Sequence, residues 1–157
     1  MKEEKIYLTK EGLEKIKKQY QNLQEIKKSK AKGETPEFFH SEEVNPEYLS
    51  FQEDLNFLED QIKEVEYILK NAQLIKSSSK EKRGIVDLGA LVLVETDDGQ
   101  VDEFKIVGSL EANPAIGKIS NESPVGKALL GHKIGDKIIV QSAIKTTYKI
   151  KKIKYQF

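Results

Sequence analysis

The chain has no cysteine and no tryptophan, and its 157 residues include only two histidines, His40 and His132. Without cysteine there are no disulfides, no thiolate catalysis and no cysteine-ligated zinc. Two histidines are also too few for a histidine-rich metal site. No apolar run near the N-terminus is long enough for a signal peptide or a membrane span. We therefore expect a cytoplasmic protein without membrane contact.

Neither sign of charge dominates, because the chain carries 26 basic and 26 acidic residues and its net charge is zero. A simple nucleic-acid coat protein would be basic overall, so the composition argues against that class. With 38% hydrophobic and 33% charged residues, the chain can build a modest core under a heavily charged surface. Its length suits one medium domain or two small ones.

The first half of the chain has the apolar period of α-helices. Thr9 is a good N-cap for a first helix, which Gly33 ends. Asn45 can cap a second helix that begins at Pro46 and runs to about residue 75. In both segments apolar residues recur three and four positions apart, on one stripe of the helix. The two stripes comprise Leu13, Ile16, Tyr20, Leu23 and either Ile26 or Lys27, and then Leu55, Leu58, Ile62, Val65, Leu69 and Ala72.

Two narrow stripes joined by a short segment favour an antiparallel helical hairpin over a bundle or a dimerising coiled coil. The charges of the two segments are complementary. Residues 10–32 contain eight lysines and three acids, whereas residues 34–66 contain eleven acids and one lysine. We expect salt bridges between the helices that fix their register. This pairing does not explain Glu42 and Glu43, which are either solvated loop residues or carboxylates carried to a partner's metal site.

The second half has the pattern of a small α+β domain. Residues 77–82 are polar and unpatterned, which is typical of a linker. Residues 85–95 and 101–107 predict strands around a hairpin turn at Asp98-Gly99. Further strands are expected at residues 137–142 and 147–153, with a short helix over residues 124–130 that Ser123 caps. We predict a coiled-coil domain over residues 1–76, a linker over 77–83 and a β-rich domain over 84–157.

Motifs along nearly the whole chain resemble the Gre family of bacterial transcription elongation factors, GreA and GreB. In the first half these are Leu8-Thr9-Lys10-Glu11-Gly12-Leu13, Asn45-Pro46-Glu47-Tyr48 and Asn71-Ala72-Gln73-Leu74-Ile75. In the second half they include Glu111-Ala112-Asn113-Pro114, Gly117-Lys118-Ile119-Ser120 and Ser123-Pro124-Val125-Gly126-Lys127-Ala128-Leu129-Leu130-Gly131.

The resemblance implies an antiparallel coiled coil that enters the secondary channel of RNA polymerase and an FKBP-like domain that binds the channel rim. It implies an accessory factor without a cofactor of its own, which stimulates the polymerase's cleavage of backtracked RNA and acts on the RNA 3′ end only indirectly. Acidic tip residues would help to hold the second Mg²⁺ of the polymerase active site. We expect a monomer whose partner contacts come from Ser123, Pro124, Leu129, Leu130, Gly131, Asn45 and Tyr48.

The tip departs from the family pattern. Counted back from Asn45, the family's acidic positions fall on Ser41 and Val44, neither of which is a carboxylate. The segment around Thr35-Pro36-Glu37 resembles a new helix start, so the tip is remodelled. We therefore expect Glu42 and Glu43 to be the catalytic, metal-binding carboxylates. The alternative is a channel-binding inhibitor or modulator that does not stimulate cleavage.

Two functions of other classes stay open. An FKBP-like domain could be a prolyl isomerase, but the second half offers few aromatic residues for a pocket: Phe104, Tyr148, Tyr155 and Phe157. A free-standing coiled-coil scaffold would be an obligate dimer. His132 follows Gly131 in a predicted turn, and we expect it to be a surface residue.

Overall fold

The computed structural model describes residues 4–33, 35–40, 43–76, 84–141 and 144–155. The chain forms two compact units, Leu13–Asn71 and the combination of Met1–Gly12 with Ala72–Phe157. None of the helices among the described residues is long and apolar enough to cross a membrane. The α+β class with a helical hairpin and a β-rich domain is confirmed.

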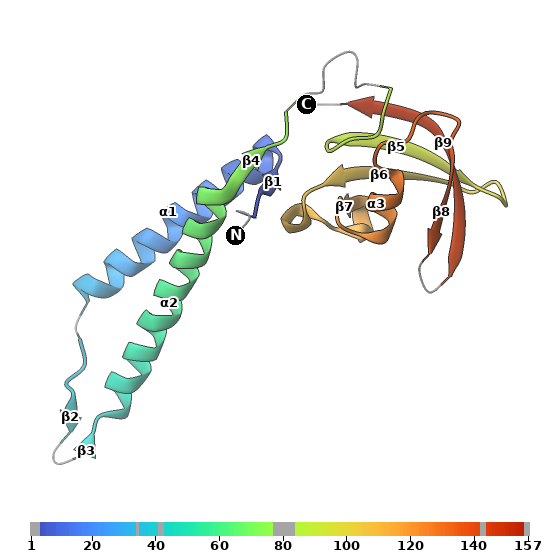
Figure 1. The fold of residues 1–157 in the computed structure, drawn as a ribbon. Coiled ribbons are helices and arrows are strands. Elements are labelled where there is room, and N and C mark those ends of the chain that lie inside the picture. Colours follow the sequence, from blue (N-terminus) through green and yellow to red (C-terminus); the bar gives the residue numbers. More distant parts are fainter. Residues whose placement is uncertain (1–3, 34, 41–42, 77–83, 142–143, 156–157) are drawn as a thin grey trace. The chain divides into compact units, whose positions relative to one another are not determined.

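The helical unit is a pair of long helices, α1 (Lys10–Lys32) and α2 (Pro46–Asn71) (Figure 1). The contacts between them show that they are antiparallel, because later residues of α1 meet earlier residues of α2. Tyr20 donates a hydrogen bond to Glu66 at 3.1 Å, Lys27 lies 3.6 Å from Glu59, and Lys30 lies 3.1 Å from Asp54. The predicted salt bridges are thus present. Each such exposed pair contributes only about 0–1 kcal/mol, so they set register more than stability.

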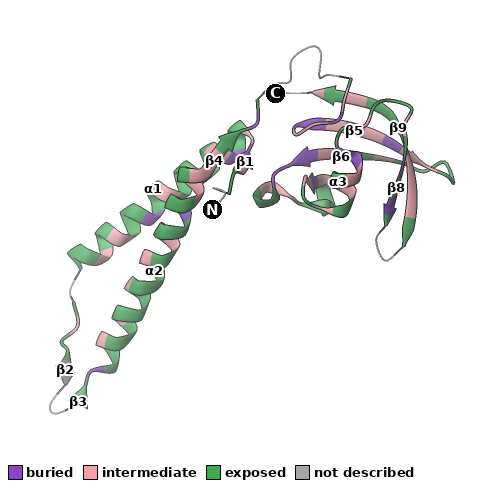
Figure 2. Cartoon of the chain, in the orientation of Figure 1, coloured by how far each residue is buried: buried purple, intermediate pink, exposed green. Residues whose placement is uncertain are grey.

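A narrow apolar seam runs between the two helices, as their spacing predicts. Figure 2 shows α1 and α2 as largely exposed outside this seam. Of the open alternatives for α1, Lys27 faces α2 and Ile26 is 52% exposed. The buried members of the seam are Leu23, Leu58, Ile62 and Val65, with Ile16, Tyr20 and Leu69 packed against them.

The second helix ends earlier than predicted. It stops at Asn71, and Ala72–Leu74 forms strand β4, which pairs in parallel with β1 (Ile6–Leu8). The Ile75 amide then donates to the Leu8 carbonyl at 2.8 Å, and both side chains are buried. Pairing with β1 satisfies backbone groups that one more helical turn would satisfy internally, and it also buries apolar surface. The helical period of the sequence does not show that residues 72–74 can pair with β1 instead.

The β-rich unit contains a five-stranded sheet in the order β7-β6-β5-β9-β8. Its strands are β5 (Ala90–Thr96), β6 (Val101–Val107), β7 (Lys118–Ser120), β8 (Lys137–Gln141) and β9 (Lys145–Tyr155). The turn predicted at Asp98-Gly99 joins β5 to β6, with Gly99 at a φ of 86° that favours glycine. Residues 85–89 are not part of β5, because the Val86 amide donates instead to the His132 carbonyl at 2.9 Å.

The core of this unit lies between the sheet and helix α3 (Pro124–Leu129), which Figure 1 shows close to β7. Alternate residues of the strands face it, so Val92, Val94 and Ile150 have no measurable exposure. Three of the aromatic residues considered for an isomerase pocket pack against this core. They are Phe104, Tyr148 and Tyr155.

Both ends of the helical segment belong to the same compact unit as the sheet, because Met1–Gly12 and Ala72–Phe157 cluster together. The predicted domain bounds stay a prediction. Thr9 donates two hydrogen bonds to the Glu111 carboxylate, from its amide at 2.7 Å and from its hydroxyl at 2.5 Å. Glu111 lies in the short helix η1 (Ser109–Glu111). A side chain at Gly108 would stand 2.0 Å from the Tyr7 carbonyl, so glycine is needed for this close approach. The predicted linker, residues 77–83, lies outside the described residues.

Candidate functional site

The far end of the helical unit is a small hairpin of two short strands, β2 (Phe39–His40) and β3 (Glu43–Val44). They pair antiparallel, with Phe39 opposite Val44 and His40 opposite Glu43 (Figure 1). The helix start predicted near Thr35 is wrong, because residues 35–37 are not helical. The backbone carbonyl of Glu37 is instead held by the side chain that caps α2.

That capping residue is Asn45, as predicted, and it is the one polar residue among the buried residues described. Its amide group donates to the Glu37 carbonyl at 2.8 Å, and its oxygen accepts the Glu47 amide at 3.0 Å. Its backbone amide donates to the Phe38 carbonyl at 2.9 Å. With 8% of its surface exposed, Asn45 fixes the tip and offers a partner almost no contact area.

Replacing Asn45 by alanine should destabilise the helical unit by about 1–2 kcal/mol, the usual cost of removing an N-cap that also satisfies a buried carbonyl. Asn45→Asp is the matched control. It keeps an oxygen that accepts from Glu47, and it replaces the donor to Glu37 by a carboxylate oxygen. Amide hydrogen exchange of residues 37–48 measures both variants. Equal protection in wild type and Asn45→Ala would show that this cap does not hold the tip.

The apolar side chains of the tip are unusually open. Phe38 is 47% exposed and packs edge to face on Tyr48, with ring centroids 4.9 Å apart. Val44 is 40% exposed and Leu49 is 50% exposed. Tyr48, expected to contact a partner, therefore also supports Phe38. Its role in binding stays a prediction.

Of the two carboxylates expected at the tip, Glu43 is exposed on β3, and Glu42 lies outside the described residues. The described residues contain no group of three or more His, Cys, Asp or Glu side chains that could hold a metal ion. A single exposed carboxylate is still suited to add one oxygen ligand to a hard cation that a partner already holds. The metal role of Glu42 and Glu43 stays a prediction.

The second group of predicted contact residues surrounds α3. Ser123 caps this helix as predicted, accepting the Gly126 amide at 3.0 Å and donating to the Ser120 carbonyl at 2.6 Å. Pro124 follows it and is exposed. A side chain at Gly126 would stand 2.0 Å from the Ser120 carbonyl, so glycine is required where α3 approaches β7.

The prediction that Leu129 contacts a partner is corrected by its burial. Leu129 has no exposed surface and belongs to the core under the sheet, so its contribution is packing. Leu130 is half-buried and Gly131 is exposed, with a φ of 82°. Among the predicted contact residues of this segment, Pro124 and Gly131 are exposed, and Ser123 and Leu130 are half-exposed.

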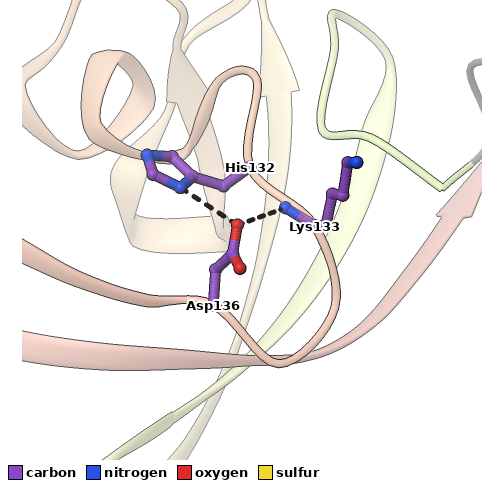
Figure 3. Close-up of polar contacts among 3 residues, drawn as sticks. All are labelled: His132, Lys133 and Asp136. Carbon is purple, nitrogen blue, oxygen red and sulfur yellow. Dashed lines mark hydrogen bonds and ion pairs between the residues drawn. The ribbon is translucent and has the colours of Figure 1, made fainter.

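A short turn fixes the end of this segment (Figure 3). Asp136 accepts the Lys133 amide at 2.9 Å, and its carboxylate lies 3.2 Å from Nδ1 of His132. The hydrogen bond from the Lys133 backbone, followed by that from His132, holds the pKa of Asp136 below its ordinary value of 3.8. His132 is a half-exposed residue, close to the expected surface position. No spacing rule indicated the pair, because a spacing of four brings side chains together on a helix and residues 132–136 form a turn.

Asp136→Asn should lower the melting temperature at neutral pH, because hydrogen bonds in the folded chain stabilise the ionised Asp136 carboxylate and are absent from the unfolded chain. A pKa depressed on folding gives stability that is present above the unfolded value, about 4, and is lost as pH falls through the folded value. The difference between wild type and Asp136→Asn should therefore close below about pH 4. Melting curves across this range test it, and a gap that persists in acid would contradict it.

Comparison with known proteins now gives the chain a family. Two family models match it, "Transcription elongation factor, N-terminal" over residues 6–74 and "Transcription elongation factor, GreA/GreB, C-term" over residues 80–155. The transcription elongation factor GreA of Listeria monocytogenes serotype 4a is 36% identical over 158 residues, covering 98% of both chains. GreA of Thermomicrobium roseum is 35% identical over 144 residues, covering 90% of this chain and 92% of its own.

Among solved structures, the GreA factor homolog 1 (Gfh1) of Thermus thermophilus is 26% identical and covers 96% of this chain and 99% of its own. Its TM-score of 0.43 is too low to add to the assignment, which stands on the sequence matches. Those matches span both halves of the chain in the order that its motifs predict. The chain belongs to the GreA/GreB family of transcription elongation factors.

Proposed function

We propose that this elongation factor binds bacterial RNA polymerase, inserts its helical hairpin into the secondary channel and stimulates cleavage of backtracked RNA. The observation that carries the proposal is the exposed carboxylate of Glu43 at the far end of a slender two-helix stalk. At about 1.5 Å per residue, the 26 residues of α2 extend about 39 Å. Such a stalk is suited to carry an acidic group into a deep and narrow channel.

Within this mechanism the chain positions groups and the polymerase performs the chemistry. Glu43, together with Glu42, would supply oxygen ligands to the second Mg²⁺ of the polymerase active site. That metal, when bound, activates a water and stabilises charge on the phosphate that is cleaved. Asn45 keeps the tip in one arrangement, because its buried amide joins Glu37, in the segment before β2, to the start of α2. A fixed tip loses little entropy when its carboxylates engage the metal.

The exposed part of the segment around α3 is the proposed contact with the channel rim. Pro124 and Gly131 present surface, and the Ser123 cap and the Asp136 turn hold the two ends of the segment in place. Rigid loops of this kind bind without a large ordering cost. The family membership supports polymerase as the partner.

A second candidate function rests on Val44. In the family pattern this position carries the catalytic glutamate, and here it is an apolar side chain that is 40% exposed. A tip with Val44 and Ser41 at the acidic positions favours a factor that occupies the channel without stimulating cleavage. Under this alternative Val44→Glu would create cleavage activity that the wild type lacks.

The two functions differ in one assay. The wild-type chain is added to backtracked elongation complexes, and the length of the RNA is followed over time, while binding to polymerase is measured in parallel. Stimulated cleavage predicts shortened RNA, and channel occupancy alone predicts binding, unchanged RNA length and an altered rate of synthesis. Absence of polymerase binding would contradict both.

A further inference from the structure

One face of the five-stranded sheet is strongly basic in a chain whose charges balance overall. Along β8 and β9, buried residues such as Ile138, Val140 and Ile150 alternate with exposed ones. The alternation places the exposed set on the side of the sheet away from its core. Five lysines of this set are Lys137, Lys145, Lys149, Lys152 and Lys154. A sixth exposed lysine, Lys151, lies at a β-bulge where β9 shifts register against β5, and it pairs with Glu95 at 2.9 Å.

The basic face continues across the sheet to its other edge. Lys105 on β6 lies directly opposite Lys118 on β7, and Lys137 on β8 lies directly opposite Lys149 on β9. Like charges opposite each other on neighbouring strands are destabilising. This face thus carries a repulsion that folding alone does not require and that a bound polyanion would relieve.

Acidic residues on this face are few. Glu95 and Glu103 lie on this face, because their neighbours Val94 and Phe104 face the core. Glu95 lies opposite Lys149 on β9 and is in an ion pair with Lys151 at 2.9 Å. Among the described residues, this is the one ion pair that involves the lysine face. A surface that serves only for solubility usually mixes both signs. The opposite imbalance occurs on α2, which carries seven acids and two lysines.

The chemistry of the face indicates which polyanion it fits. Protein–protein contacts favour arginine and aromatic residues and are depleted in lysine. The only arginine of the chain, Arg83, lies outside the described residues, and the charge of the face is carried by lysine. Lysine ammonium groups on flexible stems act as point charges that bind phosphate without demanding one geometry. The face therefore suits a nucleic-acid backbone better than an acidic protein surface.

The positions of the aromatic residues of the sheet indicate whether the lysine face suits single-stranded or double-stranded nucleic acid. Phe104, Tyr148 and Tyr155 pack against the core, on the side opposite the lysines. Proteins that hold single strands combine basic residues with aromatic side chains on which bases stack. The described strands offer no aromatic residue on the lysine face, so contact with unstacked bases is not favoured. Phosphates of a duplex need only charge.

We propose that the lysine face of the sheet binds the phosphate backbone of double-stranded DNA, without sequence specificity. The contact is independent of the tip carboxylates and of the segment around α3, so it goes beyond the proposed function. It would let the factor bind DNA weakly near the polymerase on which it acts. Because the binding is mainly electrostatic, its affinity should fall steeply with salt.

The test uses the full chain and a labelled duplex of random sequence, with affinity measured by fluorescence anisotropy between about 50 and 200 mM salt. In the sheet variant, four exposed lysines are replaced by glutamine: Lys137, Lys149, Lys152 and Lys154. Binding should weaken by about tenfold or more at low salt, and the slope of log affinity against log salt should become shallower by about 3–4. Each lost phosphate contact removes about 0.9 from that slope.

A matched control removes the same charge from α1, by glutamine at four exposed lysines outside the ion pairs: Lys15, Lys17, Lys18 and Lys28. This control should change affinity less than about twofold. Three results would each overturn the proposal. They are equal weakening in both variants, tighter binding of wild type to a single strand of equal length, and no duplex binding by wild type. So would a sheet variant that loses polymerase binding and keeps duplex binding, because the face would then fit an acidic protein.

If the sheet variant does not fold, two double variants replace it. They are Lys137→Gln with Lys149→Gln and Lys152→Gln with Lys154→Gln, and each should show about half the change in slope.

Discussion

Glu43→Gln is expected to slow RNA shortening by about 100-fold in backtracked complexes while leaving polymerase affinity unchanged. The change keeps the size and polarity of the side chain and removes its charge, so the loss reports the missing metal ligand. Changes that only reorient metal ligands already cost about 10- to 100-fold, so loss of a ligand should lie at or beyond the upper end. The measurement is the initial rate of cleavage at saturating factor.

Glu53→Gln is the matched control for this prediction, because Glu53 is an exposed carboxylate on the body of α2. It should leave the cleavage rate within about twofold of wild type, since a solvated carboxylate away from the metal has little influence. Equal rates for Glu43→Gln and wild type would remove Glu43 from the mechanism. Equal losses in both variants would show that only the overall charge of the stalk matters.

Leu129→Ala is expected to destabilise the β-rich unit by about 2–5 kcal/mol, the range for truncating a fully buried leucine. Leu129 has no exposed surface and packs with Ile106, Ile138 and Ile150 in the core between α3 and the sheet. Chemical denaturation followed by circular dichroism measures the loss. A substantial decrease in free energy of unfolding would account for any weaker polymerase binding by this variant.

Comparing Leu130→Ala with Leu129→Ala distinguishes a loss of core packing from a loss of polymerase binding. It is half-buried, so Leu130→Ala should cost less stability than Leu129→Ala, by about 1 kcal/mol or more. If the segment contacts polymerase, Leu130→Ala should weaken binding at temperatures where the variant is fully folded. A stability loss for Leu129→Ala as small as that for Leu130→Ala would contradict the described core.

The features that the sequence predicted correctly depend on a regular period or on residues close together in the chain. The stripe from Leu55 to Leu69 and the opposite charges of the two segments specified an antiparallel helical pair, and the contacts of Lys27 and Lys30 confirm it. The N-caps at Asn45 and Ser123 were also predicted from local chemistry, because a cap acts on residues within one turn. The Asp98-Gly99 turn is local in the same way.

The sequence failed where distant residues compete for the same backbone. The helical period continues through Ala72, yet β1 captures residues 72–74 as a strand. Strand β7 has three residues, which is too short for an alternating pattern to be recognised. The contact from Thr9 to Glu111 spans 102 positions, and no local pattern indicates it.

The candidate site was predicted in part for the same reasons. The motif around α3 identified the segment, but a motif does not separate Leu129, which is buried, from its neighbour Leu130. At the tip, the role of Asn45 as a cap followed from its position, whereas its bond to Glu37 depends on the path of the chain before β2. The lysine face was indicated in part by the spacing of Lys145, Lys149, Lys152 and Lys154, and only the strand register joins these residues to Lys137 and Lys105.

The central claim is that tip carboxylates help to hold a Mg²⁺ ion in the polymerase active site. Its most direct test is the Mg²⁺ dependence of RNA cleavage, measured with polymerase alone, with the wild-type chain and with the double variant Glu42→Ala, Glu43→Ala. Wild type should lower the half-maximal Mg²⁺ concentration by about tenfold or more relative to polymerase alone, and the double variant should abolish this shift. A half-maximal concentration that is the same for wild type and the double variant would contradict it.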